Sequence, residues 1–329
     1  MTRPLTLQRV CAVLFLLVAL AMAALGTAVW CGGSGCSIEA ASSDILWQLR
    51  LPRALSAFVV GGLLALAGAL MQLLLRNPLA DPYVLGISGG AATGAMAMSW
   101  LAPAALATVG LPLGAFGGAL LATALLFGLA RRALMGLTPA LASSPSGVRL
   151  ILTGVMISAG FGALMSLMLS LAPEGQLRGI VFWLMGELDS GPLLWPAWLV
   201  LSLATFWACG HARQLNVLSH GEATAQLLGV PVRRLRAMAL LVASLATASA
   251  VAVAGSIGFV GLVVPHGLRL VLGNDQRLLL PASALAGGTA LTLADLLARS
   301  LVAPVQLPVG VVTALVGVPV FLMLLARSR

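Results

Sequence analysis

The sequence predicts an all-α polytopic membrane protein with ten transmembrane helices, and two observations carry that prediction. Of the 329 residues, 60% are hydrophobic and only 8% are charged, and the mean hydropathy is +1.07. A soluble domain of this size needs far more charge to cover its surface. The second observation is the recurrence of apolar runs of about 20 residues, the length that an α-helix needs to cross a bilayer. We therefore expect one transmembrane domain over residues 1–329.

The first apolar run follows Arg3 and Arg9 and extends from Val10 to about Trp30. It is longer than the apolar core of a signal peptide, roughly 7–15 residues, and no convincing cleavage site follows it, so we interpret it as the first span. Glycine and proline within the later runs are tolerated because neighbouring helices satisfy the freed backbone groups. The expected spans cover residues 9–30, 53–75, 84–102, 105–130, 148–171, 192–210, 235–254, 257–272, 279–299 and 308–326.

The basic residues predict the orientation. The net charge of +9 comes from 18 arginines and no lysine. Such a balance can indicate nucleic-acid binding, but these arginines stand singly or in short clusters between apolar runs, which favours topology control and excludes a nucleic-acid partner. If both termini lie in the cytoplasm, fourteen of the arginines lie on the cytoplasmic side. Only four lie outside, namely Arg50, Arg53, Arg178 and Arg299. This bias predicts cytoplasmic termini.

The stretch RNPLADPYVLGISGGA, residues 76–91, interrupts two apolar runs at the cytoplasmic side. Irregular backbone at membrane depth persists only where it lines a cavity or is buried in protein. Pro78 and Pro82 fix the backbone of this turn, and the Asn77 side chain can hydrogen-bond the freed backbone groups. The sequence therefore predicts a structured turn with a function.

Glycines at helical spacing predict close helix packing. Gly86, Gly90 and Gly94 are four residues apart, as are Gly114 and Gly118, and this spacing lets membrane helices approach closely. The glycines of GSIGFVG, residues 255–261, are three apart with no strand before them, so they do not form a dinucleotide fingerprint. We expect them to form a tight turn and to pack the following span.

The longest cytoplasmic loop, residues 211–234, predicts a short helix from Gly221 to Leu228, with Gly229 as its stop and Pro231 opening the next helix. Its apolar residues Leu218, Ala223, Leu227 and Leu228 face water. A water-facing helix with an apolar face indicates a docking element for a partner. The alternative is a helix that lies on lipid headgroups.

Candidate catalytic residues are few. Gly86-Ile87-Ser88-Gly89 matches the motif of rhomboid-type intramembrane serine proteases, with His266 as the second member, but the match is short, ten spans are too many, and both residues are expected near the cytoplasmic face. HExxH, zinc-like Cys/His spacing and paired intramembrane carboxylates are absent from the sequence, and the scarcity of acids disfavours an ion-coupled transporter. Asp295 and Arg299, four residues apart, can pair on one helix face.

Cysteine usage leaves two interpretations open. Cys31 and Cys36 flank GGSG at the outer end of the first span and can form a disulfide in an oxidising periplasm, or they are two small interfacial residues. Cys11 and Cys209 are expected to pack against other residues.

In order along the chain, six stretches resemble the permease subunits of ABC importers for iron chelates and vitamin B12, the FecCD/BtuC-type family. The resemblance covers nearly the whole chain after the first span. The stretches are LRLPRALSAFVVGGLLALAGALMQ (49–72), NPLADPYVLGISGGA (77–91), LNVLSHGEATAQLLGVP (215–231), GSIGFVGLVVPHGLRLVLG (255–273), LLPASALAGG (279–288) and LADLLARSLVAPVQLPVGVVTALVG (293–317).

The resemblance implies the type II ABC importer permease fold in a bacterial inner membrane. It implies a symmetric homodimer in which the substrate pathway runs along the dimer interface. Two ABC ATPase subunits would bind on the cytoplasmic side, and a periplasmic binding protein would bind on the opposite side. The chain is then not an enzyme and binds no cofactor or metal, because ATP and Mg²⁺ belong to the ATPase. The implied cargo is a metal chelate, namely a ferric siderophore, haem or a corrinoid such as vitamin B12.

The resemblance also assigns residues. It implies that Asn77, Pro78 and Leu79 form a cytoplasmic gate and that Arg50 and Arg299 face acidic residues of the binding protein. For these arginines the alternative is that Arg299 neutralises Asp295 and Arg50 anchors at the interface. In the family, the short helix from Gly221 to Leu228 would be the coupling helix, the element that contacts the ATPase. His220 departs from the small or apolar residue expected beside it. The residues implied to contact the ATPase are Leu218, Gly221, Glu222, Ala223, Gln226, Leu227 and Gly229.

Overall fold

The structure is a computed structural model that describes residues 7–32, 45–101, 107–134, 146–188, 194–303 and 305–327. Each of the ten predicted spans contains a helix. These are α1 (Leu7–Trp30), α3 (Leu51–Leu75), α4 (Ile87–Leu101), α5 (Ala107–Leu134), α6 (Ser146–Leu171), α8 (Leu194–Ser219), α10 (Val232–Ala254), α11 (Val260–Leu272), α12 (Gln276–Ser300) and α13 (Val309–Arg327). The shorter elements are η1 (Leu46–Arg50), η2 (Pro82–Leu85), α7 (Glu174–Leu184) and α9 (Glu222–Leu227).

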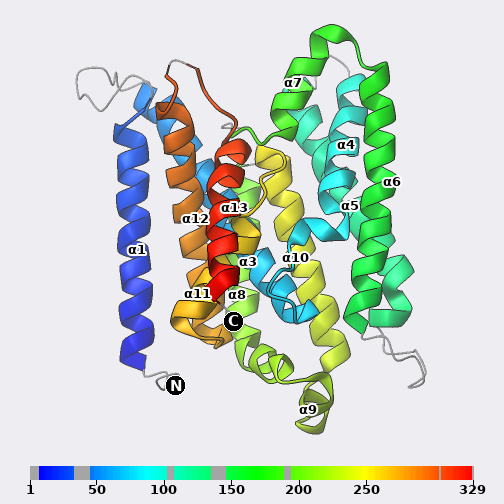
Figure 1. The fold of residues 1–329 in the computed structure, drawn as a ribbon, viewed down its shortest axis with the longest axis vertical. Helices are drawn as coiled ribbons and strands as arrows, with labels where there is room; N and C mark the ends of the chain where they lie inside the picture. The colour runs from blue at the N-terminus through cyan, green and yellow to red at the C-terminus, as the bar shows by residue number, and fades with distance from the viewer. Residues whose placement is uncertain are drawn as a thin grey trace.

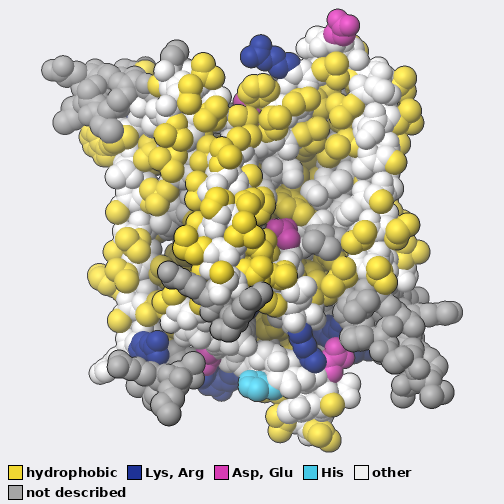
Figure 2. All heavy atoms as spheres, in the orientation of Figure 1, with side chains coloured by type: hydrophobic (Ala, Val, Ile, Leu, Met, Phe, Trp, Pro, Cys, Tyr) yellow, Lys and Arg dark blue, Asp and Glu magenta, His cyan; other side chains and the backbone are white. Residues whose placement is uncertain are grey.

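Length and hydropathy support a multi-pass membrane protein. Within the described ranges, 7 helices are long and apolar enough to cross a membrane, and α11 is a shorter apolar helix. The all-α prediction is confirmed, whereas the count of ten crossings stays a prediction. Most charged side chains on the face drawn in Figure 2 gather at the two ends of the molecule, with a hydrophobic band between them.

The long helices run roughly parallel, with α1 at one edge and α6 at the other (Figure 1). Helix α3 forms the centre of the molecule, and every residue from Ser56 to Leu74 is buried. It packs against α8, α10, α11 and α12, while α4 packs against α5 and α6. Helix α9 lies at the same end as the N-terminus, and α7 lies at the opposite end.

Glycines allow the helices to contact each other through their backbones. A Cβ atom added at Gly94 would lie 2.1 Å from the Gly114 carbonyl oxygen, and one at Gly90 would lie 2.5 Å from that of Gly118. The predicted close approach along this glycine ladder is confirmed, with α4 and α5 as the partners. A second seam joins α3 to α12 at Gly61.

Two boundaries differ from the predictions. Helix α8 continues through Ser219 rather than ending near residue 210, because its buried face continues through Leu215 and Leu218. Helix α11 begins only at Val260, since positive φ angles of 66° at Gly255 and 69° at Phe259 interrupt the chain before it. Helix α7 was not predicted, because it lies between the expected spans 148–171 and 192–210 and is too short to cross a membrane.

Candidate functional site

The turn after α3 is a structured element. Helix α3 ends at Leu75, and the next residue, Arg76, adopts a left-handed conformation with φ 48°. The Asn77 Oδ1 atom accepts a hydrogen bond from the Leu79 backbone N–H at 2.9 Å, and the Asp81 Oδ1 atom accepts one from Tyr83 N–H at the same distance. Two such Asx turns replace helical hydrogen bonds in this irregular segment. Pro78 and Leu79 are exposed at its tip.

Long-range hydrogen bonds hold this turn against α11. The Tyr83 hydroxyl oxygen accepts a bond from the Ile257 backbone N–H at 3.1 Å. Above the turn, the buried Gln72 amide nitrogen donates to the Leu262 carbonyl at 3.0 Å, and Arg269 donates to the Gln72 side-chain oxygen at 2.9 Å. The turn is therefore fixed to the segment that precedes and forms α11, far away in sequence.

The predicted short helix in the loop after α8 is present as α9. Gly221 and Gly229, at its two ends, have positive φ angles of 134° and 75°, conformations that glycine adopts readily. The Glu222 carboxylate pairs with Arg236 of α10 at 2.6 Å. This pair fastens the beginning of α9 to the beginning of the next long helix.

Helix α9 buries Ala225 and presents its other apolar residues outward. Leu227 is 89% exposed and the adjacent Leu228 is 67% exposed. Leu218, which the sequence also suggested for this surface, is instead buried in the chain's own core. The outward apolar surface therefore consists of Ala223, Leu227 and Leu228.

A polar joint links the end of α8 to the beginning of α12. The Asn216 amide nitrogen donates to the Asp275 carboxylate at 2.8 Å, and its oxygen accepts from the Gln276 backbone N–H at 2.7 Å. Hydrogen bonds from the Arg277 guanidinium, opposed by partial burial and aided by Asn216, lower the pKa of Asp275 from 3.8 to about 2. Asp275 is therefore an anion at neutral pH, and it also caps α12.

A cluster of basic residues surrounds one carboxylate at the opposite end of the molecule. Asp295 of α12 is fully buried and pairs with Arg53 of α3 and Arg299 of α12, each at 3.0 Å. The predicted Asp295–Arg299 pair is confirmed. Arg53 also donates to the Gln306 side chain at 2.8 Å. A single buried acid thus joins two helices through ion pairs and one charge-assisted hydrogen bond, from Arg53 Nε to Asp295 Oδ1.

The arginines predicted to face a binding protein are less accessible than expected. Arg50 is 7% exposed and donates to the Trp30 carbonyl oxygen at 2.9 Å. Arg299 is 6% exposed and donates to the Ala28 carbonyl oxygen at 3.2 Å. Both guanidinium groups therefore hold the end of α1. Arg53, whose side chain is 21% exposed, was not predicted, and its partner lies 242 residues away, so no local pattern identifies it.

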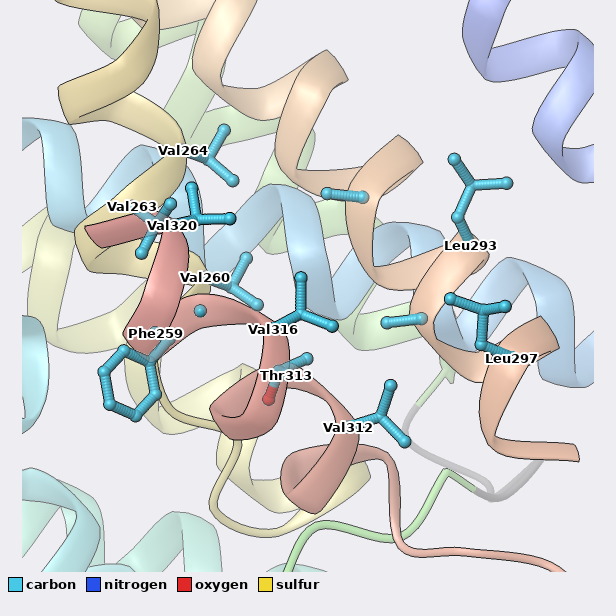
Figure 3. Close-up of a pocket in the computed structure, with 13 residues that line it drawn as sticks. Phe259, Val260, Val263, Val264, Leu293, Leu297, Val312, Thr313, Val316 and Val320 are labelled. Atoms are coloured by element: carbon cyan, nitrogen blue, oxygen red, sulfur yellow. The ribbon is translucent and has the colours of Figure 1, made fainter. Parts of the chain in front are cut away.

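An apolar cavity of about 260 Å³ lies between α11, α12 and α13 (Figure 3). Phe259, Leu297 and Val316 belong to its lining, and Thr313 supplies the one polar side chain among the described lining residues. Such a lining cannot solvate a charged ligand. The cavity therefore offers no specific polar recognition.

The protease interpretation gains no support. His266 is buried, and neither ring nitrogen has a hydrogen-bond partner among the described residues, so no hydrogen bond joins it to Ser88. Its ring packs at a tilt against Phe321, with 6.3 Å between centroids.

The cysteines differ in their state. Cys31 is disulfide-bonded, and Cys36 lies outside the described residues. Cys11 and Cys209 are free and exposed, so the prediction that these two pack against other residues is wrong within this chain. Over the described ranges, no cluster of three or more His, Cys, Asp or Glu residues could hold a metal ion.

The described residues form a bundle of membrane-length helices with an irregular turn after its core helix and a short outward-facing helix, an arrangement compatible with a transport permease. The chain belongs to the FecCD transport family, whose family model matches residues 7–327. The family consists of transport permeases, and ATP hydrolysis belongs to a separate ATPase subunit. The prediction that the chain is not an enzyme is confirmed on this ground.

Two curated relatives illustrate the similarity. The chain is 43% identical over 307 residues to YvrB of Bacillus subtilis, an ABC transporter permease protein, covering 91% of this chain and 83% of YvrB. It is 42% identical over 287 residues to the vitamin B12 import system permease protein BtuC of Citrobacter koseri, covering 86% of this chain and 83% of BtuC.

Two solved structures share the fold. One, described as an inward-facing conformation of a metal-chelate type ABC transporter, has a TM-score of 0.85 and 31% identity, and the match covers 96% of this chain and 99% of that one. The other, PsaBC from Streptococcus pneumoniae in complex with Fab, has a TM-score of 0.56 at 18% identity over 86% of this chain and 93% of that one, and shows the fold alone. The predicted type II importer permease fold is confirmed.

Proposed function

We propose that this chain is the membrane-spanning subunit of an ATP-driven importer that moves a metal chelate from the periplasm to the cytoplasm by alternating access along a homodimer interface. Family membership over residues 7–327 carries the proposal. The similarity to BtuC makes a corrinoid the first cargo to test, with ferric siderophores and haem next. Both termini and α9 then lie in the cytoplasm, and the end with Asp295 faces the periplasm.

The proposed cytoplasmic gate is the turn of Asn77, Pro78 and Leu79. Its support is the exposed Leu79 at the tip, 43% accessible, on a turn that the Asn77 carboxamide shapes and Tyr83 holds in place. A rigid turn with an apolar tip can narrow a pathway between two copies of the chain. The gate opens when the two copies separate.

Asn77→Ala is expected to loosen this gate, because it removes the acceptor for the Leu79 N–H, worth about 1 kcal/mol. In proteoliposomes without ATP, passive leak of the cargo should rise above that of the parent, while Asn77→Asp, which keeps the acceptor oxygen, should stay tight. An unchanged leak in Asn77→Ala would remove Asn77 from the gate.

The proposed coupling element is α9 with its flanking glycines. An outward-facing segment that would enter a cleft in the ATPase is formed or flanked by Gly221, Glu222, Ala223, Gln226, Leu227 and Gly229. Leu218 supports this segment from inside the core. Movement of the two ATPases on binding and hydrolysing ATP would then shift α9 and, through the Glu222–Arg236 pair, the beginning of α10.

The proposed docking surface for the binding protein is the basic cluster around Asp295. Arg50, Arg53 and Arg299 supply three positive charges against one buried carboxylate, so the cluster attracts acidic residues. Arg53 is the most accessible of the three and presents this charge, while Arg50 and Arg299 anchor α1 behind it.

Arg53→Glu is expected to weaken binding-protein association at least about tenfold, since it reverses a charge at a partly exposed site. Arg178→Glu, on exposed α7, is the control for the charge change alone, because Arg178 forms no salt bridge in the described ranges, whereas Arg53→Glu also places a second carboxylate beside buried Asp295. Surface-captured binding protein and purified transporter variants give the affinities, and thermal unfolding checks that both variants remain folded. Equal affinities for Arg53→Glu and the parent would contradict the assignment.

Cellular uptake tests the function itself. Labelled cobalamin, ferric siderophores and haem are supplied to the parent strain and to one that lacks this gene. Selective loss of accumulation of one compound, restored by the gene on a plasmid, is the expected result. Unchanged accumulation of every compound, in a strain where no second permease of this family is present, would contradict the proposal.

A further inference from the structure

A groove between α8 and α10 forms a second site, away from the turn, α9 and the basic cluster. It is a cavity of about 400 Å³ lined by seven described residues. Trp207, His211 and Gln214 lie on α8 at spacings of four and three residues, and Arg234 and Met238 lie four apart on α10, so each helix contributes one face. Pro231 and Leu235 complete the lining.

One end of the groove is suited to an anion. Arg234 is exposed and forms no salt bridge with any residue in the described ranges. The His211 Nδ1 atom lies 2.9 Å from the Trp207 carbonyl oxygen, which only accepts, so Nδ1 carries the proton and Nε2 is left to accept a hydrogen bond from a hydroxyl group of a ligand. Gln214 adds a side-chain amide, and none of the seven lining residues is acidic.

The other end of the groove is apolar and continues along both helices. The Trp207 and His211 rings stack with 4.8 Å between centroids. Leu203, one turn before Trp207, is 59% exposed, and Leu241, on the same face of α10 as Met238, is 37% exposed. An anion-binding end followed by an apolar track towards the middle of two membrane helices has the polarity of a phospholipid.

The position of the groove agrees with that ligand. It lies where α8 ends and α10 begins, next to α9, at the end of the molecule that we place in the cytoplasm. Tryptophan is enriched at this depth, and basic pockets between transmembrane helices on the cytoplasmic side bind anionic headgroups.

We propose that this groove binds an anionic phospholipid of the inner leaflet. Arg234 holds the phosphate, the His211 Nε2 atom accepts a hydrogen bond from a headgroup hydroxyl such as that of phosphatidylglycerol, Gln214 contacts the headgroup, and an acyl chain lies along Trp207, Leu203, Met238 and Leu241. The bound lipid would contact both α8 and α10, the two long helices that α9 connects. This depth assignment rests on the orientation proposed above, but lipid binding can be measured without transport, so either proposal can fail alone.

The test is native mass spectrometry of the permease purified with its ATPase, titrated with phosphatidylglycerol or phosphatidylcholine. Arg234→Gln should weaken phosphatidylglycerol binding about tenfold, the loss of one charge-assisted hydrogen bond. His211→Ala should weaken it less, and neither should change phosphatidylcholine binding. Arg233→Gln is the matched control, because it removes the same charge from an adjacent exposed residue outside the groove.

Three outcomes would overturn the proposal. Equal losses in Arg233→Gln and Arg234→Gln would show general attraction of a basic surface. Binding of inorganic phosphate that competes fully with phosphatidylglycerol, at equal affinity, would show an anion site with no role for the acyl chain. Loss of the ATPase from Arg234→Gln with lipid binding intact would show that the groove contacts protein.

Discussion

Replacing Leu227 with glutamate is expected to abolish ATPase assembly and ATP-dependent uptake while leaving the permease folded. Leu227 is 89% exposed at the end of α9, so the chain loses no internal packing when it is changed. In the proposed complex the same side chain enters an ATPase cleft, where an unpaired buried carboxylate costs several kcal/mol. The effect should therefore appear in the complex and not in the isolated subunit.

Co-purification of the ATPase measures assembly, and thermal unfolding of the permease alone measures its stability. Leu227→Met keeps the apolar area and should retain assembly and uptake, which separates the effect of charge from that of any change at this position. Normal ATPase recovery with Leu227→Glu would show that α9 does not enter the ATPase, and would leave a position on lipid headgroups as the interpretation of its apolar face.

Replacing Gly68 with alanine is expected to destabilise the fold by about 3 kcal/mol, the upper end of the usual cost of overpacking. A Cβ atom at Gly68 would lie 1.8 Å from the Gly261 carbonyl oxygen, and that neighbour is backbone that cannot rotate away. Helices α3 and α11 must separate to admit it. This loss occurs although alanine is intrinsically the better helix former by about 1 kcal/mol.

Gly210→Ala is the control for Gly68→Ala. Gly210 lies inside α8, and nothing lies within 4 Å of a Cβ atom added there, so the same substitution should leave the melting temperature unchanged or raise it slightly. Thermal unfolding in one detergent, with the yield of monodisperse protein, measures both variants. Equal melting temperatures for Gly68→Ala and the parent would refute the close contact between α3 and α11.

Hydropathy and glycine spacing predicted most of the fold, because both act locally. Every predicted span contains a helix, and the ladder at Gly90 and Gly94 packs as its spacing indicated. Helix α9 was also predictable, since helix formers stand there between Gly221 and Gly229. Helix α7 was missed because it lies between two expected spans and is too short to cross a membrane.

The candidate site was predicted less completely, because its contacts join distant parts of the chain. The prolines around Asn77 predict the turn. The hydrogen bond between Tyr83 and Ile257 that holds it joins residues 174 positions apart, and no local pattern predicts it. Arg53 gives no local sign of its pairing with Asp295. Burial of Arg50 also could not be foreseen, because it depends on how the end of α1 packs over that side chain.

The joint between Asn216 and Asp275 has a thermodynamic consequence. Helix α12 has 25 residues, about 37 Å of continuous helix, with this joint at one end and Asp295 near the other. If nucleotide at the ATPase alters the affinity for the binding protein through this helix, linkage requires that the binding protein alter nucleotide affinity by the same factor. Through α12, cargo delivery and ATP binding would then share a single coupling free energy.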